Sequence, residues 1–362
     1  MSYTFYAAFI PGLQECIAEI IRERLPDAVI HKLLDGAVLF ETQCSYDKLN
    51  FFCFNNIFAV AGIMEQNGPD QALEAHITAV ITGKAAAGKV SAGIPLTAEK
   101  IIAQNSKKFH SFRIVVSKEN KPAAVSEKLR AQAEQYITRL SDLSVNRSRP
   151  DTEFWFLYRS EGFSLFMKRL TLRASWEKSL HPGELPPPLA WILCRLGGLT
   201  HSDTVLDPFC GYGSIPDAVL KYFHITKCIA CDNNSEAAAY TRGRFKDRTP
   251  GSFIFHKTDF RSLVSLVSEK SVDVIITDPP WGFYSPDKST LQDGEANISI
   301  KQLYEEMFRV FGVLLKEGGR AVVLCANKDE ILGAATGRFE LQKNIPILLS
   351  GKKTAIFQFK FV

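Results

Sequence analysis

The sequence predicts an α/β protein in which a small α+β unit precedes a mostly parallel sheet covered by helices on both faces. Three observations support this prediction. From residue 204 onward, short apolar strands alternate with segments of helical spacing, which is the pattern of βαβ units. These strands are nearly continuous apolar runs, as a sheet buried on both faces requires. The first 60 residues instead mix strands with two helices, which is typical of an α+β unit.

Composition limits the class of protein. A length of 362 residues favours two or three domains, and 46% hydrophobic with 23% charged residues is ordinary for a globular protein. No apolar run approaches 18 residues, and the N-terminus lacks a basic segment followed by an apolar one. We therefore expect a cytoplasmic protein without a membrane span, and we favour a monomer.

The eight cysteines indicate buried thiols rather than a metal site. Most of them lie inside apolar runs, as free thiols do in a reducing compartment. Cys228 and Cys231 have the spacing of a metal-binding pair, but their run is apolar and no second pair accompanies them. A core strand explains them better, and no metal is expected.

The N-terminal half shows strand and helix patterns in mixed order. Leu13, Ile17, Ile20 and Ile21 share one face of a helix, and charged residues lie on the other. Residues 45–59 are expected to form a helix that leads into a strand. Further strands are predicted at 3–10, 28–33, 37–41, 112–116, 154–158 and 163–168, and further helices at 71–82, 96–106 and 124–140.

A proline-rich stretch separates the two halves. Four prolines lie within residues 182–188, and because proline fixes φ they indicate an ordered, extended linker. We place the main boundary between about 170 and 180. After it, strands are predicted at 204–207, 227–232, 253–257, 272–277, 320–325, 339–341, 345–350 and 354–362, and helices at 189–196, 215–222, 235–245, 260–267 and 300–315.

Charge is unevenly distributed. The net charge is only +4, yet residues 100–149 hold 11 Lys or Arg against 4 Asp or Glu. Such a local excess is typical of a surface that binds a phosphate backbone. A solvated face explains it equally well when the segment is considered alone.

A glycine-containing turn follows the strand at 204–207. The run ends in Asp207, and Gly211 and Gly213 then allow backbone angles and close approaches that side chains forbid. Such a strand, turn and helix place backbone near a ligand at the carboxyl edge of a parallel sheet. Pro216 stands where the third glycine of a dinucleotide fingerprint would fall, so an ordinary turn remains an alternative.

Four acids fall at the carboxyl ends of successive predicted strands: Asp207, Asp232, Asp259 and Asp278. Ligands of open α/β sheets bind at that edge. Asp232 follows the glycine turn by about 20 residues, the distance at which an acid meets ribose hydroxyls. Any one of these acids could cap a helix, but four in register favour a binding site.

The stretch Asp278-Pro279-Pro280-Trp281 predicts a rigid corner. Two prolines remove two N–H donors and fix two φ angles, so backbone carbonyls stay available beside a carboxylate. The indole offers a flat face to a planar base. Asp278 and a backbone carbonyl would accept the two hydrogens of a conjugated –NH₂ group and orient its nitrogen lone pair toward an electrophile.

Together these motifs resemble a known family. The stretch from Asp207 to Ile215 looks like the first motif of class I S-adenosylmethionine (SAM)-dependent methyltransferases, in the form found in THUMP-containing RNA guanine-N2 methyltransferases. Asp278 to Trp281 resembles their catalytic motif, and His181 to Pro186 resembles the segment before their first strand. Tyr212 and Ser214 depart from the Ser and Thr usual in the family.

The resemblance implies a domain arrangement. It predicts a ferredoxin-like subdomain at 1–60, a THUMP-like RNA-binding domain at 61–169, a linker at 170–188 and a methyltransferase domain at 189–362. The last would be Rossmann-like, with a mostly parallel seven-stranded sheet.

The resemblance also assigns roles to residues. Asp207 and the two glycines would line the methionine end of SAM, Asp232 would bind its ribose and Asp259 would meet its adenine. The full predicted cofactor set is Gly183, Leu185, Asp207, Phe209, Gly211, Gly213, Asp232, Asn233, Asp259 and Phe260. The target base would be held by Asp278, Pro279, Pro280 and Trp281, and RNA would be contacted by Lys107, Lys108, Arg113, Arg147 and Arg149.

The sequence therefore predicts methylation of the exocyclic N2 of a guanosine in structured RNA, with tRNA favoured over rRNA. An adenine-N6 methyltransferase is an alternative, because that amine fits the same corner. A nucleotide-dependent dehydrogenase and a non-catalytic RNA-binding protein are alternatives from other classes. The absent third glycine argues against the dehydrogenase, and the complete set of acids argues against a degenerate pocket.

Overall fold

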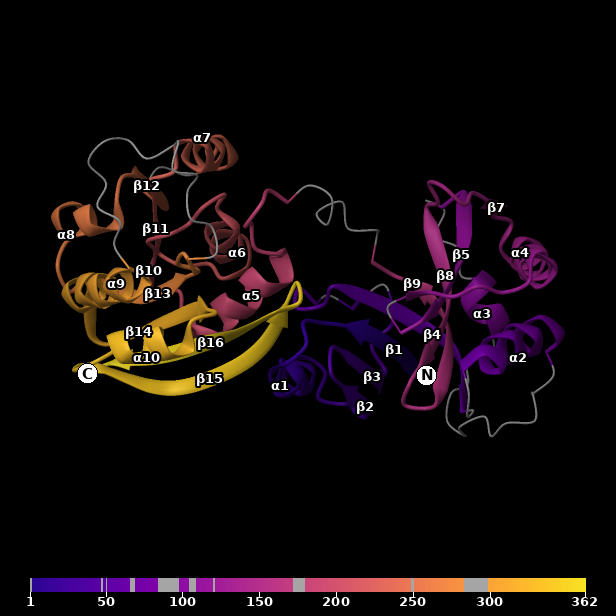
Figure 1. Cartoon of the computed structure of the whole chain (residues 1–362). Coiled ribbons are helices and arrows are strands. Elements are labelled where there is room, and N and C mark those ends of the chain that lie inside the picture. Colours follow the sequence, from indigo (N-terminus) through magenta and orange to yellow (C-terminus); the bar gives the residue numbers. More distant parts are fainter. Residues whose placement is uncertain are drawn as a thin grey trace. The chain divides into compact units, whose positions relative to one another are not determined.

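The computed structural model of the chain describes residues 2–46, 48–49, 51–65, 69–83, 98–103, 109–119, 121–171, 180–248, 251–282 and 299–362. The chain divides into two compact units (Figure 1). Unit 1 comprises Met1–Phe9 with Gln14–Ala174, and unit 2 comprises Ile10–Leu13 with Ser175–Val362.

Unit 1 is an α+β unit built on one sheet. Its strands are β1 (Tyr3–Ala8), β2 (Val29–Leu34), β3 (Ala37–Thr42), β4 (Asn56–Glu65), β5 (Ser111–Lys118), β6 (Lys121–Pro122), β7 (Ser144–Val145), β8 (Thr152–Arg159) and β9 (Phe163–Arg169). Its helices are α1 (Gln14–Arg24), α2 (Pro69–Thr82), α3 (Ala98–Ala103) and α4 (Glu127–Ser141).

The strands of unit 1 pair in the order β2-β3-β1-β4-β9-β8-β5-β6, and β7 pairs with β5. Strand β4 crosses residue 60, so a single sheet runs through the predicted ferredoxin-like and THUMP-like segments. Helices α2, α3 and α4 bury their apolar sides against β5 and β8. The domain limits inside unit 1 stay predictions.

The predicted helix at the start of residues 45–59 is wrong. No helix occurs among the described residues of 45–55, and β4 begins only at Asn56. Aromatic packing explains this: Tyr46 lies 4.8 Å from Tyr3, and Phe54 lies 5.3 Å from Phe51, measured between ring centroids. Burying these rings from an irregular segment outweighs the weak local helix preference.

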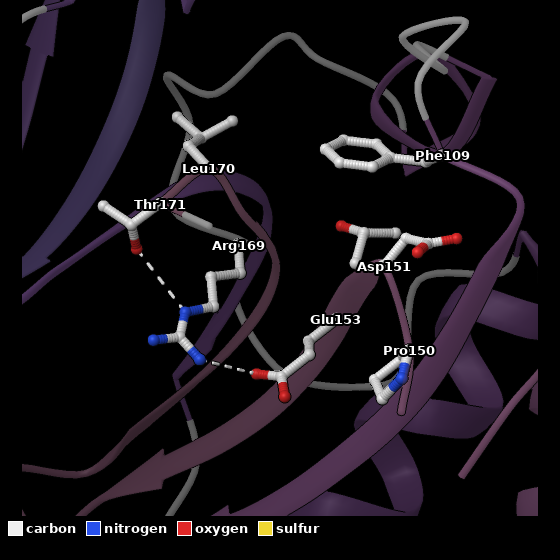
Figure 2. Close-up of a pocket in the computed structure, with 8 residues that line it drawn as sticks. Phe109, Pro150, Asp151, Glu153, Arg169, Leu170 and Thr171 are labelled. Carbon is white, nitrogen blue, oxygen red and sulfur yellow. Dashed lines mark hydrogen bonds and ion pairs between the residues drawn. The ribbon is translucent and has the colours of Figure 1, made fainter. Parts of the chain in front are cut away.

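A charged cluster surrounds the buried Glu153 of β8 in unit 1. Its carboxylate accepts hydrogen bonds from Arg113 at 2.5 Å, from Arg169 at 3.1 Å and from the Trp155 indole at 2.9 Å. Figure 2 shows the Arg169 side chain directed at Glu153 and Thr171. The adjoining cavity has about 10 Å³ of space, enough for about one water molecule, so we interpret it as structural.

Replacing Glu153 with glutamine is expected to lower the free energy of unfolding by about 3–5 kcal/mol, because two buried or half-buried guanidinium groups would lose their anion. Urea unfolding measures the change. Glu127→Gln is the control, since Glu127 is exposed where it pairs with Arg147, and it should cost less than about 1 kcal/mol. Equal losses in the two variants would contradict the prediction.

Unit 2 alternates strands and helices. Its strands are β10 (Thr204–Asp207), β11 (Lys227–Asp232), β12 (Phe253–Lys257), β13 (Val272–Thr277), β14 (Leu315–Cys325), β15 (Phe339–Leu349) and β16 (Lys352–Phe361). Its helices are α5 (Pro187–Leu196), α6 (Ser214–Tyr222), α7 (Ser235–Arg244), η2 (Phe260–Ser262), α8 (Leu263–Leu266), α9 (Ile300–Leu314) and α10 (Lys328–Ala334).

The seven strands of unit 2 form one mixed sheet in the order β12-β11-β10-β13-β14-β16-β15. The pairings from β12 to β14 are parallel, and β16 pairs antiparallel with both β14 and β15. The order reverses at β10, so the carboxyl ends of β10 and β13 flank a topological switch point, where ligands of such sheets bind.

Helices cover both faces of this sheet. Ile275 of β13 belongs to the cluster formed with α8, α9 and α10. Its neighbours Val274 and Ile276 point to the opposite face, where Gly197 at the end of α5 approaches them. This burial on both faces is the reason why the strands are continuously apolar.

Unit 2 differs from the sequence prediction in several details, and strand β14, for example, begins at Leu315 rather than at residue 320. The segments expected at 339–341 and 345–350 form one strand, β15, whose pairing with β16 shifts register between Leu341 and Lys343. Helix α10 has no counterpart in the sequence prediction. It buries Ile331 and Ala334 against the cluster of α9, which supplies the stability that seven residues lack alone.

Candidate functional site

The predicted acids lie along one edge of the sheet in unit 2. Asp207 and Asp232 end β10 and β11, Asp278 follows β13 directly, and Asp259 follows β12 after one residue. Because these four strands are parallel neighbours, all four acids lie at the carboxyl edge, as predicted.

Asp207 is buried beneath the glycine turn. Its Oδ1 accepts hydrogen bonds from the Thr277 hydroxyl at 2.8 Å and from the Phe209 N–H at 3.2 Å. Its Oδ2 is buried without a partner in the described part of the chain. Burial, aided by the nearby Asp232 carboxylate, raises the pKa of Asp207 to about 7.

Asp232 fixes the shape of the glycine turn. Its Oδ2 accepts the Gly211 N–H at 2.7 Å, and its Oδ1 accepts the Asn234 N–H at 2.8 Å. Burial raises the pKa of Asp232 above its usual value. A Cβ added at Gly211 would meet nothing within 4 Å, so open space lies over the turn that Asp232 holds.

Gly213 allows helix α7 to pack against the turn. Its φ is 85°, and an added Cβ would lie 2.8 Å from a ring carbon of Phe245. The Thr241 hydroxyl, also on the buried side of α7, donates to the Gly211 carbonyl at 2.8 Å. Close contact with α7 therefore requires glycine at position 213.

Gly213→Ala is expected to lower the free energy of unfolding by about 1–3 kcal/mol, because the new methyl group strains the backbone and displaces the Phe245 ring. Gly243→Ala is the control. Gly243 lies in α7 at an exposed position with open space around it, so alanine should be neutral or stabilise the helix by up to about 1 kcal/mol. Chemical denaturation of both variants tests this, and an unchanged Gly213→Ala protein would contradict it.

Glu184 joins the proline-rich segment to the turn. Its carboxylate accepts hydrogen bonds from the His181 N–H at 3.1 Å, the Ser214 hydroxyl at 3.3 Å and Arg244 at 3.0 Å. The Tyr212 ring stacks on His181 with 4.0 Å between ring centroids. The two unusual residues of the turn, Tyr212 and Ser214, thus both contact this segment.

The remaining predicted cofactor residues lie around the same edge. Leu185 is buried, and Gly183 has a φ of 81° with open space around it. The Phe209 and Phe260 rings lie 4.8 Å apart, and Asn233 is exposed. The residues predicted to hold SAM are therefore brought together by the fold.

Asp259 has a local role in addition to its place at the edge. It caps the short helix η2 by accepting the Arg261 N–H at 2.9 Å. Its other carboxylate oxygen pairs with the Arg261 guanidinium at 2.8 Å. A ligand amine at this position would share Asp259 with that arginine.

The Pro-Pro corner follows β13. Oδ1 of Asp278 is buried and has no partner among the residues that the structure describes. Burial, and then the neighbouring Asp207 carboxylate, raises the pKa of Asp278 well above its usual value. The Trp281 indole donates to the Leu324 carbonyl at 3.3 Å, which fixes the ring beside β14.

Several residues of the site were not singled out from the sequence. Glu184 and Thr277 lie inside the motifs themselves, so their place in the motif could have identified them. Tyr304 of α9 and Asn327 after β14, which contact the corner, carry no local signal because only the fold brings them there.

The residues predicted to contact RNA lie in unit 1. Lys107 and Lys108 fall outside the described residues. Arg113 pairs with Glu153, and Arg147 pairs with Glu127 and Glu134, so both arginines also have partners within the protein. Arg149 is exposed.

Cys228 and Cys231 are buried in β11, which confirms the core strand. Within the described ranges, no three His, Cys, Asp or Glu side chains are grouped as metal ligands would be. No helix in that part of the chain is long and apolar enough to cross a membrane.

Residues 174–347 match the sequence model of the RMKL-like methyltransferase domain. A tRNA (guanine(10)-N2)-dimethyltransferase of Methanothermobacter thermautotrophicus is 26% identical over 178 residues, which cover 49% of this chain and 49% of that protein. The match thus spans about half the length of that relative.

Two solved structures share the fold along the whole chain. TrmN from Thermus thermophilus has a TM-score of 0.74 at 20% identity, covering 99% of this chain and 100% of that one. SMU.472, solved in complex with SAH, has a TM-score of 0.67 at 13% identity, covering 100% and 98%. At these identities the likeness concerns the fold alone, whereas the match of residues 174–347 to the RMKL-like methyltransferase domain is a likeness in sequence.

Proposed function

We propose that this protein transfers a methyl group from SAM to the exocyclic N2 of a guanosine in tRNA. One observation carries the proposal: the corner after β13 presents a buried carboxylate oxygen of Asp278 without a partner. In this proposal the Pro279 carbonyl, next in the chain, is the second acceptor, so that the pair matches the two hydrogens of one –NH₂ group.

The residues at the sheet edge fit SAM as the cofactor. The orphaned Oδ2 of buried Asp207 and the open space over Gly211 suit a cationic ligand at close range. In this proposal Asp207, Gly211 and Gly213 line the methionine end, Asp232 binds the ribose hydroxyls, and Phe209 and Phe260 lie near the adenine. SAM supplies an activated methyl group on a sulfonium.

The protein contributes chiefly position to this reaction. Asp278 and the Pro279 carbonyl hold the amine so that its lone pair faces the methyl carbon. As the N–C bond forms and the S–C bond breaks, the amine nitrogen loses one proton. Asp278 in its ionised form, or water, can receive it. A base within a stem must be extruded to reach this corner.

Unit 1 is proposed to bind RNA through backbone and shape, as its basic segment favours. Since Arg113 and Arg147 are paired, the exposed Lys118, Lys121 and Arg149 are better candidates for phosphate contacts. The guanosine target is favoured by the name of the archaeal relative, a tRNA (guanine(10)-N2)-dimethyltransferase that matches about half of this chain. The THUMP-like character of unit 1 and a cytoplasmic location are part of the same proposal.

Nucleoside mass spectrometry tests the function. The purified protein is incubated with SAM and unmodified tRNA or rRNA, and the RNA is digested. N2-methylguanosine in the tRNA is the expected product. N6-methyladenosine would establish the adenine alternative. Methylation of rRNA alone would make rRNA the substrate in place of tRNA. The proposal would be overturned if no RNA were methylated and a calorimetric titration showed binding of NAD but not of SAM.

A further inference from the structure

Two carbonyls of the Pro-Pro corner already accept hydrogen bonds from side chains of other elements. The Tyr304 hydroxyl, on α9, donates to the Pro280 carbonyl at 2.8 Å. The Asn327 amide nitrogen, after β14, donates to the Trp281 carbonyl at 2.9 Å and to the Tyr304 oxygen at 3.2 Å. Successive peptide units of the corner are thus held by two linked side chains from separate elements.

The side chain of Asn327 does not have the role that is usual for asparagine at its position. It stands at the N-cap of α10, a position where asparagine normally accepts a backbone N–H of the first turn. Its side chain makes no such capping bond. Instead its amide reaches the corner, and its own N–H donates to the Cys325 sulfur at 3.2 Å. The Asn327 side chain therefore contacts the corner and does not cap α10.

Tyr304 is suited to remain a hydrogen-bond donor. The side chain is fully buried, and burial raises the pKa of its hydroxyl above the usual value, so the proton is retained throughout the working pH range. The Cys325 sulfur lies 3.3 Å from the same oxygen. If the hydroxyl moved away from the Pro280 carbonyl, it would also lose its contacts with Cys325 and Asn327.

We propose that Tyr304 and Asn327 are positioning residues for the target amine: by occupying the Pro280 and Trp281 carbonyls, they leave the Pro279 carbonyl and Asp278 as the two acceptors that orient it. This inference rests on the proposed function. Neither side chain touches the base. They set the direction of the two acceptors, and an acceptor misplaced by about 1 Å can lower the rate on the order of a hundredfold.

Tyr304→Phe tests the inference because it removes one hydroxyl and keeps the buried ring. We expect kcat for tRNA methylation to fall about tenfold or more, while the Kd for SAM changes less than about twofold. Tyr136→Phe is the matched control. Tyr136 is also a buried helical tyrosine, but it lies in unit 1, and its variant should retain the wild-type kcat.

Asn327→Ala and the double variant separate positioning from folding. If both side chains brace one corner, the double variant should lose much less kcat than the product of the two single losses. A Tyr304→Phe enzyme with wild-type kcat, or a loss of SAM affinity equal to the loss of kcat, would overturn the inference. The inference would also be overturned if the loss of kcat in the double variant equalled the product of the two single losses. An inactive wild-type enzyme would instead overturn the proposed function, so the two failures are distinguishable.

Discussion

Asp278→Ala is expected to lower kcat for RNA methylation by roughly a thousandfold while the Kd for SAM stays within a few-fold of the wild-type value. Oδ1 of the carboxylate that alanine removes is buried and without a partner among the described residues. Besides a hydrogen bond with Trp281, the variant loses one of the two acceptors proposed to hold the amine. Steady-state kinetics and calorimetric SAM binding measure the two effects separately.

Asp273→Ala is the matched control, because this acid lies on the same strand, β13, at a distance from the corner. Asp273 accepts hydrogen bonds from Lys316 at 2.7 Å and from the Thr204 N–H at 2.9 Å. Its loss should cost some stability and leave kcat unchanged. Should Asp278→Ala abolish SAM binding instead, Asp278 would belong to the cofactor site and not to the amine corner.

Asp207→Asn is expected to change how the stability of the protein without SAM depends on pH. The pKa of Asp207 is raised to about 7, chiefly by burial, from its usual value of 3.8. Between these values the folded protein keeps a proton that the unfolded chain has released. The contribution of Asp207 to the free energy of unfolding is therefore greatest at low pH and is lost as pH rises through about 7.

Asparagine cannot ionise, yet its oxygen can still accept from Thr277 and from the Phe209 N–H. The variant should therefore become more stable relative to wild type by about 3 kcal/mol between pH 5 and pH 8. Urea unfolding of both proteins at a series of pH values gives this difference directly. A difference that does not vary with pH would show that Asp207 titrates normally in the folded protein.

The order of elements in unit 2 could be predicted because local pattern and burial agree there. Apolar runs ending in Asp207, Asp232 and Asp278 indicated parallel strands, and a shared edge for their carboxylates followed from that topology. The prediction failed at 45–55, where the position of the aromatic side chains depends on rings from β1 and β3. A window of neighbouring residues carries no information about such distant partners.

The sequence by itself determined the glycine turn, the acids in register and the Asp278-Pro279-Pro280-Trp281 corner, because backbone constraints and short spacings are encoded locally. Only the tertiary structure decided which atoms remain free for chemistry. Glu184 binds the turn across 30 residues, and Tyr304 reaches the Pro280 carbonyl from α9. These hydrogen bonds join elements whose proximity is set by packing of the whole sheet, and no local pattern specifies them.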